Sequence, residues 1–487
     1  MFPYSSLIQI DKDSKLPVYR QIAITIINAI TNGVLKSGTP LLSSRAMAEA
    51  LGVHRKTVIA AYEELSAQEW ISTFPRKGVF VSQHIPQLKP KKWNQDEPLY
   101  AYAHDMHIPF KTLGTLAQQM GISKPSLVID DGRPDIRISP LDELLKTYRW
   151  LLTQKWYTQD REHSAPQGSL RLRQALVPYL SESRGLQLST DHILITHGAQ
   201  LSIYIASYLL LDAGACVLVG RPNYPMANQV FSNCGAQILE VAVDNDGIDT
   251  DEIERLCLKR KINVVYVIPH HHYPSTVTLS SERRLQLLEL SKRFSFAIIE
   301  DDYDYDYHYA SSPYLPLASA QHDGNIIYIG SFSKVLDPSI RVGFMVASQN
   351  FIQQATLLRK TIDVSGDIYL QDALAKLVKE GEIKRHLKRA KKIYHQRRDL
   401  LDQLMHQQLS PYINYIVPSG GMAIWVKLRS DLSIQTLARL AATHRLQIND
   451  IDEQEHAFRF GFASLNDQDI QAAVHILALC FVQMSPD

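Results

Sequence analysis

Six short apolar runs, interspersed with helical segments, constrain the fold of this chain more than any other feature of its sequence. Strands that are apolar at successive positions are buried on both faces, as in a mainly parallel sheet covered by crossover helices. The sequence therefore predicts a large α/β domain whose ligands bind at the carboxyl ends of the strands. The six runs cover residues 193–196, 216–219, 264–268, 296–299, 326–329 and 342–346.

The length and composition of the chain indicate more than one folded domain. Its 487 residues exceed the roughly 100–200 residues that one hydrophobic core usually serves. With 45% hydrophobic and 21% charged residues, the composition excludes a mainly disordered chain. The four cysteines lack the spacing of a metal site or a disulfide framework, and the sequence has neither a signal peptide nor a membrane-spanning run. We therefore expect a cytoplasmic protein.

The N-terminal region, residues 1–84, has a different pattern, with short amphipathic helices followed by a hairpin. A helix, a tight turn, a second helix and then a hairpin with a basic tip are typical of a winged helix-turn-helix, whose later helix enters the major groove of DNA. The helices are predicted to begin near Val18, Ser44 and Arg55, and the strands to cover 71–74 and 79–81.

The stretch from Leu42 to Val58 resembles the signature of GntR-type DNA-binding domains. Leu42 stands where proline is usual, and His54 replaces the serine that would cap the recognition helix, which predicts a looser entry into each helix. Nine basic residues face six acidic ones in residues 1–84, and this excess favours phosphate contact. A three-helix adaptor with solvated charges is the alternative. The residues expected on double-stranded DNA are Ser44, Arg45, Arg55, Lys56, Thr57, Arg76 and Lys77.

Polar residues of unusual character gather where the predicted strands of the large domain end. Because the carboxyl ends of parallel strands meet at one edge of a sheet, we expect these residues to form one ligand site. They are His197–Gln200, Tyr224, Glu300–Tyr303 and Ser331–Lys334.

The segment from Ser331 to Phe344 is similar to the Schiff-base segment of fold-type I aminotransferases, which use pyridoxal 5'-phosphate. The resemblance implies that Lys334 carries the cofactor as an internal aldimine and that hydroxyls and a guanidinium hold the phosphate dianion. A solvated lysine in a polar loop is the alternative. The side chains implied to hold the phosphate are Ser331, Ser333 and Arg341.

Other positions match the same family. Asp301 matches the carboxylate that keeps the pyridinium nitrogen protonated, and Tyr303 would donate to the ring oxygen. Tyr224 matches the aromatic residue that stacks on the ring, and Arg459 matches the arginine that grips an effector carboxylate. An ordinary core tyrosine and an ion-paired surface arginine are the alternatives for these two. A helix N-terminus would also present backbone N–H groups to the phosphate at Gly198, Ala199 and Gln200.

The two halves together resemble the MocR subfamily of GntR-type transcriptional regulators. That resemblance implies a winged helix-turn-helix in 1–84, a linker in 85–124 and an aminotransferase-like domain with a smaller C-terminal subdomain in 125–487. It also implies a head-to-tail homodimer that senses pyridoxal phosphate, with an amino-acid or amine effector in some members, and transaminase activity that is weak or absent. The alternatives are a working aminotransferase with an accessory DNA-binding domain and a DNA-binding protein with an empty large domain.

Three features are less informative. Residues 270–272 are consecutive histidines, but neighbours in an extended strand point to opposite faces and no carboxylate completes a site, so we expect no metal. His270, His272 and Thr276 depart from the subfamily pattern, as does Met226, where some relatives carry an effector-binding arginine. A basic helix over 384–398 is either a solvated face or an auxiliary contact to DNA or a partner.

Overall fold

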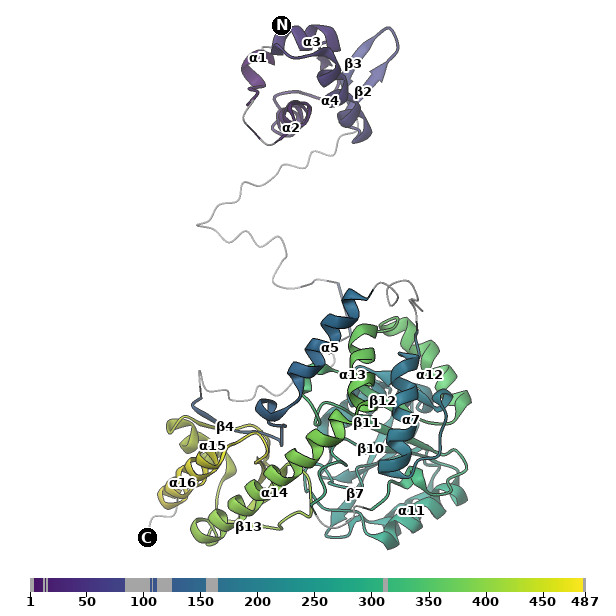
Figure 1. The fold of residues 1–487 in the computed structure, drawn as a ribbon, viewed down its shortest axis with the longest axis vertical. Coiled ribbons are helices and arrows are strands. Elements are labelled where there is room, and N and C mark those ends of the chain that lie inside the picture. Colours follow the sequence, from purple (N-terminus) through teal and green to yellow (C-terminus); the bar gives the residue numbers. More distant parts are fainter. Residues whose placement is uncertain are drawn as a thin grey trace. The chain divides into compact units, whose positions relative to one another are not determined.

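The computed structural model describes residues 4–11, 14, 16–83, 106, 108–111, 125–154, 165–309 and 314–484. They belong to two compact units, Met1–Thr112 and Leu113–Asp487, and each unit has its own core (Figure 1). The predicted linker, 85–124, lies outside the described residues except for 106 and 108–111. The predicted domain boundaries therefore stay predictions.

The N-terminal unit confirms the predicted order of three helices and a hairpin. Apolar residues on the inner faces of the helices, such as Ile22, Ile26, Val58 and Leu65, are fully buried and form its core. The three strands pair antiparallel in the order β1-β3-β2. The elements are α1 (Tyr4–Leu7), α2 (Val18–Thr31), β1 (Pro40–Leu41), α3 (Ser44–Leu51), α4 (Arg55–Ala67), β2 (Ile71–Phe74) and β3 (Gly78–Val81).

Both helices of the turn are capped, so the looser entry predicted from the sequence is wrong. Ser43 Oγ accepts from the backbone N–H of Ala46 at 3.2 Å at the start of α3. At the start of α4, His54 Nδ1 accepts from the N–H of Lys56 at 3.2 Å. The imidazole nitrogen therefore replaces the serine hydroxyl as a cap.

The large unit contains an eight-stranded sheet in the order β5-β12-β11-β10-β9-β6-β7-β8. The strands from β11 to β7 in this order are parallel, whereas β12 is antiparallel to both of its neighbours, so the sheet is mixed and mainly parallel as predicted. The strands are β5 (Ile193–Thr196), β6 (Cys216–Arg221), β7 (Gln237–Asp244), β8 (Gly247–Ile248), β9 (Val264–Val267), β10 (Ala297–Asp302), β11 (Ile326–Ser331) and β12 (Gly343–Val346).

Helices cover both faces of this sheet, which explains why its strands are apolar at successive positions. Ile298 and Ile299, adjacent on β10, are both fully buried and belong to different core clusters. One face packs against α8 (Ala199–Leu210), α9 (Pro225–Asn233) and α12 (Gln349–Ile362). The other packs against α7 (Leu170–Arg184), α10 (Thr250–Lys259), α11 (Ser281–Phe294) and α13 (Ile368–Lys379).

The smaller C-terminal subdomain has a four-stranded antiparallel sheet in the order β13-β14-β17-β16. In a separate pair, β15 lies parallel to β4. Its elements and the connecting helices are β4 (Leu127–Ile129), α5 (Leu141–Thr153), α14 (Glu382–Gln408), β13 (Ile413–Tyr415), β14 (Ala423–Leu428), α15 (Ile434–Thr443), β15 (Leu446–Ile448), β16 (Ile451–Asp452), β17 (Ala457–Gly461) and α16 (Asp467–Met484). Short 3-10 turns lie at Ile136–Ile138, Thr190–His192, Leu317–Ser319 and Pro338–Ile340.

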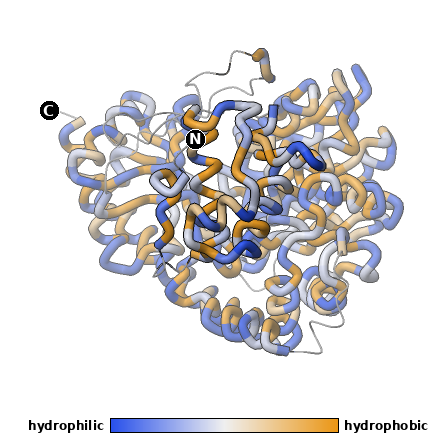
Figure 2. The backbone as a smooth tube through the Cα atoms, turned by 90° about the horizontal axis from the view of Figure 1, so that it is seen from above, coloured by the Kyte–Doolittle hydropathy of each residue, from blue (hydrophilic) through white to orange (hydrophobic). Residues whose placement is uncertain are grey.

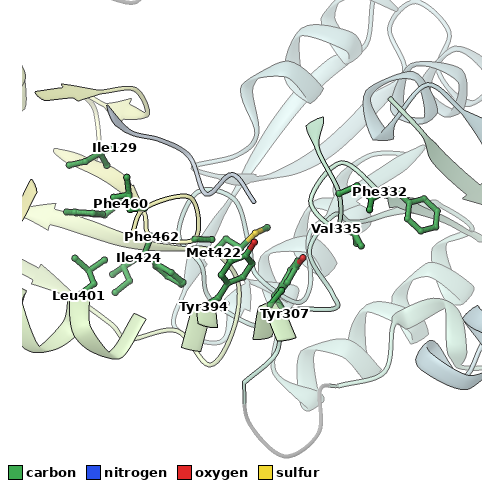
Figure 3. Close-up of a cluster of buried hydrophobic side chains, with 14 of the residues drawn as sticks. Ile129, Tyr307, Phe332, Val335, Tyr394, Leu401, Met422, Ile424, Phe460 and Phe462 are labelled. Atoms are coloured by element: carbon green, nitrogen blue, oxygen red, sulfur yellow. The ribbon is translucent and has the colours of Figure 1, made fainter. Parts of the chain in front are cut away.

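A single hydrophobic cluster joins this subdomain to the loop that follows β11. Figure 3 shows Ile424 and Phe462 of the subdomain on one side and Phe332 and Val335 of the loop on the other, with Tyr307 between them. Along the helices, hydrophilic and hydrophobic residues alternate, as expected for helices that cover a core (Figure 2). None of the described helices has the length and hydropathy that a membrane span requires.

Candidate functional site

A cavity of about 340 Å³ lies at the carboxyl ends of the strands in the large unit. Its lining brings together the polar clusters that the sequence placed at separate strand ends. Of the residues predicted to contact a cofactor or effector, all except Gly198 and Arg459 line it. They are Ala199, Gln200, Tyr224, Asp301, Tyr303, Ser331, Ser333, Lys334 and Arg341.

Lys334 lies on a loop whose neighbouring apolar side chains are buried and fix its position at the cavity. The neighbouring side chains of Phe332, Val335 and Leu336 are buried in the core. The Lys334 ammonium donates to the backbone oxygen of Gly132 at 2.7 Å and lies 3.4 Å from the Asp131 carboxylate. Its side chain is only 16% exposed, so the amine faces the cavity rather than bulk solvent.

Asp301 presents one carboxylate oxygen with a partner and one without. Tyr266, on the adjacent strand β9, donates to Oδ2 at 2.7 Å. Oδ1 is buried and has no hydrogen-bond partner among the described residues. Burial raises the pKa of Asp301 to about 7, although the Tyr266 hydrogen bond opposes the shift. A carboxylate of this kind is suited to hold a protonated ring nitrogen, whose charge would stabilise the ionised form.

A candidate anion cradle lies in the cavity lining where α8 begins. Gly198 precedes α8 with φ +85°, and a Cβ there would lie 2.7 Å from a guanidinium nitrogen of Arg341. The Ser333 hydroxyl oxygen is buried without a partner among the described residues, and the Ser331 hydroxyl accepts from the backbone N–H of Ser333. A helix N-terminus, an arginine and an unsatisfied hydroxyl together fit a phosphate.

Substitution of Gly198 by alanine tests the cradle, and the same substitution of Gly214 is the matched control. Gly198→Ala is expected to push Arg341 out of the cradle and weaken the binding of a phosphate-bearing cofactor by about tenfold or more. Gly214 has nearly the same φ, +86°, but a Cβ there would meet nothing within 4 Å. Both variants place a Cβ on a residue with positive φ and should lose stability to backbone strain, whereas only Gly198→Ala should weaken binding. Titration of cofactor absorbance checks this, and equal affinities for the two variants would contradict it.

Three tyrosines form the wall next to Lys334. Tyr224 packs edge-on against Tyr273, with 5.3 Å between ring centroids. Tyr303 donates from its hydroxyl to the backbone oxygen of His271 at 3.1 Å, and its ring centroid lies 5.7 Å from the Lys334 ammonium. Burial raises the pKa of Tyr224 to about 12, so its hydroxyl stays protonated at neutral pH. Tyr273 also lines the cavity and was not predicted from the sequence.

Arg459 lies behind this wall. It sits on β17 with a side chain that is 2% exposed, and its guanidinium donates to the backbone oxygens of Asp131 and Pro274 at 3.1 and 2.8 Å. The structure thus places Arg459 next to the candidate site but not in the cavity lining.

Sequence reasoning missed the segment that closes the cavity over Lys334. Asp131 and Arg133 follow strand β4 and line the cavity. Burial alone would raise the pKa of Asp131, but the positive charges of Lys334 and Arg459 hold it below its usual value. The run of two aspartates, glycine, arginine and proline directly after an apolar strand, 130–134, was the available signal.

The consecutive histidines have acidic or hydroxyl partners instead of a shared ligand. His270 and His271 lie 3.1 and 2.8 Å from carboxylates of Asp302 and Asp304. Within the described ranges, however, no three His, Cys, Asp or Glu side chains are grouped so that they could hold a metal ion. Burial lowers the pKa of His272 to about 3, which keeps that ring neutral.

The basic helix over 384–398 lies within α14, with its charges mostly toward solvent. Ile383, His386, Leu387 and Ala390 are buried along one side. Arg397 is also buried, and it donates to Asp135 at 2.9 Å and to the backbone oxygen of Ala463. The exposed basic residues are Lys384, Arg385, Lys388, Arg389 and Lys392.

The predicted DNA-contacting residues gather at two places of the N-terminal unit. Ser44 and Arg55 are the first residues of α3 and α4, and the Arg55 Nε donates to the Ser44 hydroxyl at 3.4 Å. The turn between β2 and β3 carries the wing residues. Ser44 and Thr57 are half-buried, and the exposed cations are Arg45, Arg55, Lys56, Arg76 and Lys77.

Comparison with known proteins agrees with both units. Residues 158–477 match the family model of aminotransferase class I and II, and residues 18–81 match that of bacterial regulatory proteins of the gntR family. The HTH-type transcriptional regulator YdfD of Bacillus subtilis is 27% identical over 478 residues, covering 97% of this chain and 98% of that protein. The probable rhizopine catabolism regulatory protein MocR of Rhizobium meliloti is 25% identical over 506 residues, covering 98% and 96%.

Among solved structures, Pyrococcus horikoshii kynurenine aminotransferase superposes with a TM-score of 0.69 at 23% identity, covering 75% of this chain and 93% of that chain. This likeness shows the fold of the large unit. The two family models match parts of both units, and the two regulators match along nearly the whole chain. The chain therefore belongs to the aminotransferase class I and II family and, with its GntR-type N-terminal domain, to the MocR-type transcriptional regulators.

Proposed function

We propose that this chain is a DNA-binding transcriptional regulator that binds pyridoxal 5'-phosphate at Lys334 and responds to it. The observation that carries the proposal is the combination of a GntR-type domain with a cavity that holds an amine, a partnerless carboxylate oxygen and an anion cradle. These three groups have the chemistry to hold the aldehyde, the ring nitrogen and the phosphate of the cofactor.

Different residues of the chain bind different groups of the proposed cofactor. When bound, pyridoxal phosphate supplies an aldehyde that reacts with primary amines and a ring that withdraws electrons. Lys334 supplies the amine for covalent attachment, and Asp301 holds the proton of the ring nitrogen. Arg341 and Ser333 bind the phosphate, and Tyr224 covers the ring. Tyr303 would orient the ring oxygen after its hydroxyl releases the backbone oxygen of His271.

The raised pKa of Asp301 predicts how stability depends on pH without cofactor. The carboxyl titrates near 3.8 when unfolded but near 7 when folded, so the folded state binds the proton more tightly. Stability therefore falls as pH rises from about 4 to about 7. Asp301→Asn removes this loss, so cofactor-free Asp301→Asn should melt several degrees above wild type at pH 8 and near it at pH 4. A lower melting temperature at both pH values would contradict the assignment.

The proposed regulator acts as a homodimer on two half-sites of double-stranded DNA. A change in the large domains on binding an effector would alter how two N-terminal domains meet their half-sites. The proposed domain boundaries, 1–84, 85–124 and 125–487, leave a linker long enough to permit such a change.

A working aminotransferase with an accessory DNA-binding domain is the second candidate, because the amine, carboxylate and arginine of the site are all present. The two candidates differ in DNA specificity and in turnover. Selection of bound fragments from genomic DNA should yield a defined operator, and the same preparation should turn over amino donors and keto acids weakly or not at all. Rapid turnover without a selected operator would favour the enzyme.

A further inference from the structure

The guanidinium of Arg459, which the family resemblance assigns to an effector carboxylate, contacts groups of the chain itself. Each of its three nitrogens has a partner: Nε and Nη1 donate to backbone oxygens of Asp131 and Pro274, and Nη2 lies 3.5 Å from the hydroxyl of Tyr303. The Tyr273 ring covers the guanidinium, with 4.7 Å between its centroid and Cζ. A ligand in the cavity therefore meets Tyr273 and Tyr303 before it reaches Arg459.

A carboxylate of the chain also neutralises this arginine. The pairing of β16 with β17 sets Ile451 opposite Phe458, and the N–H of Arg459 donates to the backbone oxygen of Asp450 at 3.0 Å. The register thus fixes Asp450 beside Arg459. Asp450 Oδ2 lies 3.7 Å from Nε and accepts from the Tyr273 hydroxyl at 2.8 Å. Asp450 therefore places a negative charge beside the guanidinium of Arg459.

A second negative charge, that of Asp131, lies in the cavity lining. Asp131 lines the cavity, with its carboxylate 3.4 Å from the Lys334 ammonium and 3.5 Å from the exposed Arg133. An amine that reacts at the position of Lys334 comes close to this carboxylate, because the carboxylate lies 3.4 Å from the Lys334 ammonium. A hydrogen or alkyl group is tolerated there, whereas an α-carboxylate meets a like charge.

Building on the proposed function, we infer that the effector site selects primary amines that lack an α-carboxylate. Asp131 attracts the cationic amine. Asp450 offsets the positive charge of Arg459, so a ligand carboxylate is bound only weakly by that arginine. This specificity is the reverse of the one that Arg459 alone would predict.

Matched ligand pairs test the inference on the full-length chain loaded with pyridoxal phosphate. The probes are 2-phenylethylamine with L-phenylalanine, and 1,4-diaminobutane with L-ornithine, each titrated against the visible absorption of the bound cofactor. We expect each amine to bind at least about tenfold more tightly than its amino acid. Equal or tighter binding of the amino acids would contradict the inference.

Two variants separate the role of Asp450 from a general effect of charge. Asp450→Asn removes the negative charge beside Arg459 and should tighten amino-acid binding about tenfold while leaving amine binding unchanged. Glu453→Gln removes a carboxylate from an exposed position nearby and should change neither. An unchanged preference in Asp450→Asn would overturn the inference. Absence of any visible band in wild type would instead overturn the proposed function, on which the inference rests.

Discussion

Replacing Lys334 by alanine is expected to abolish the visible absorption of bound pyridoxal phosphate and to weaken cofactor binding by at least about 100-fold. Lys334 is the lysine that lines the cavity, together with Arg341 and Ser333 of the cradle. The phosphate and ring contacts remain in the variant, so weak non-covalent binding should persist.

Lys360→Ala is the matched control for this substitution. Lys360 lies on α12, is exposed, and is absent from the cavity lining. The control should keep the absorption and the affinity of wild type. Retention of the visible band in Lys334→Ala would show that another amine carries the cofactor and would contradict the assignment.

The double substitution Arg55→Ala with Lys56→Ala should weaken operator binding by about 100-fold at low salt. Both side chains are exposed at the N-terminal end of α4, and neither makes an ion pair within the described part of the chain. A contact to phosphate or base is worth about 1–3 kcal/mol, and each lost phosphate contact lowers the slope of log affinity against log salt by about 0.9. Fluorescence anisotropy at several salt concentrations measures both quantities.

Arg20→Ala serves as the control for charge in the same unit. Arg20 lies on α2, where it is 3.8 Å from the Glu64 carboxylate. Its removal should leave the affinity within about twofold and the salt slope unchanged. If the double variant behaved like this control, α4 would not be the recognition helix.

Much of the large domain could be predicted because its signals are local. The six apolar runs are continuous in sequence, and each became a strand of the main sheet. The missed strand β7 has mostly partly buried or exposed residues, so it lacks the apolar pattern of its neighbours. The phosphate cradle was predictable for the same reason, because Gly198 and the segment from Ser331 to Arg341 each form a short motif.

The missed parts of the site depend on contacts between distant segments. Asp131 reaches Lys334 because β4 pairs with β15, which places Leu127 beside Leu446. The hydrophobic periodicity of neighbouring residues gives no indication of a pairing between strands that are so far apart in the sequence. Asp450 was missed likewise, since only the register of β16 with β17 sets it beside Arg459. The sequence pointed to Arg459 itself, but it did not show that the Asp450 carboxylate lies beside Arg459.

The most direct test of the proposed function measures operator affinity of the full-length chain with and without pyridoxal phosphate, in wild type and in Lys334→Ala. Coupling between two sites typically changes affinity by about 5- to 150-fold, and saturating operator must change cofactor affinity by the same factor. We predict such a change in wild type and none in Lys334→Ala. An operator affinity that is the same with and without bound cofactor in wild type would contradict the account.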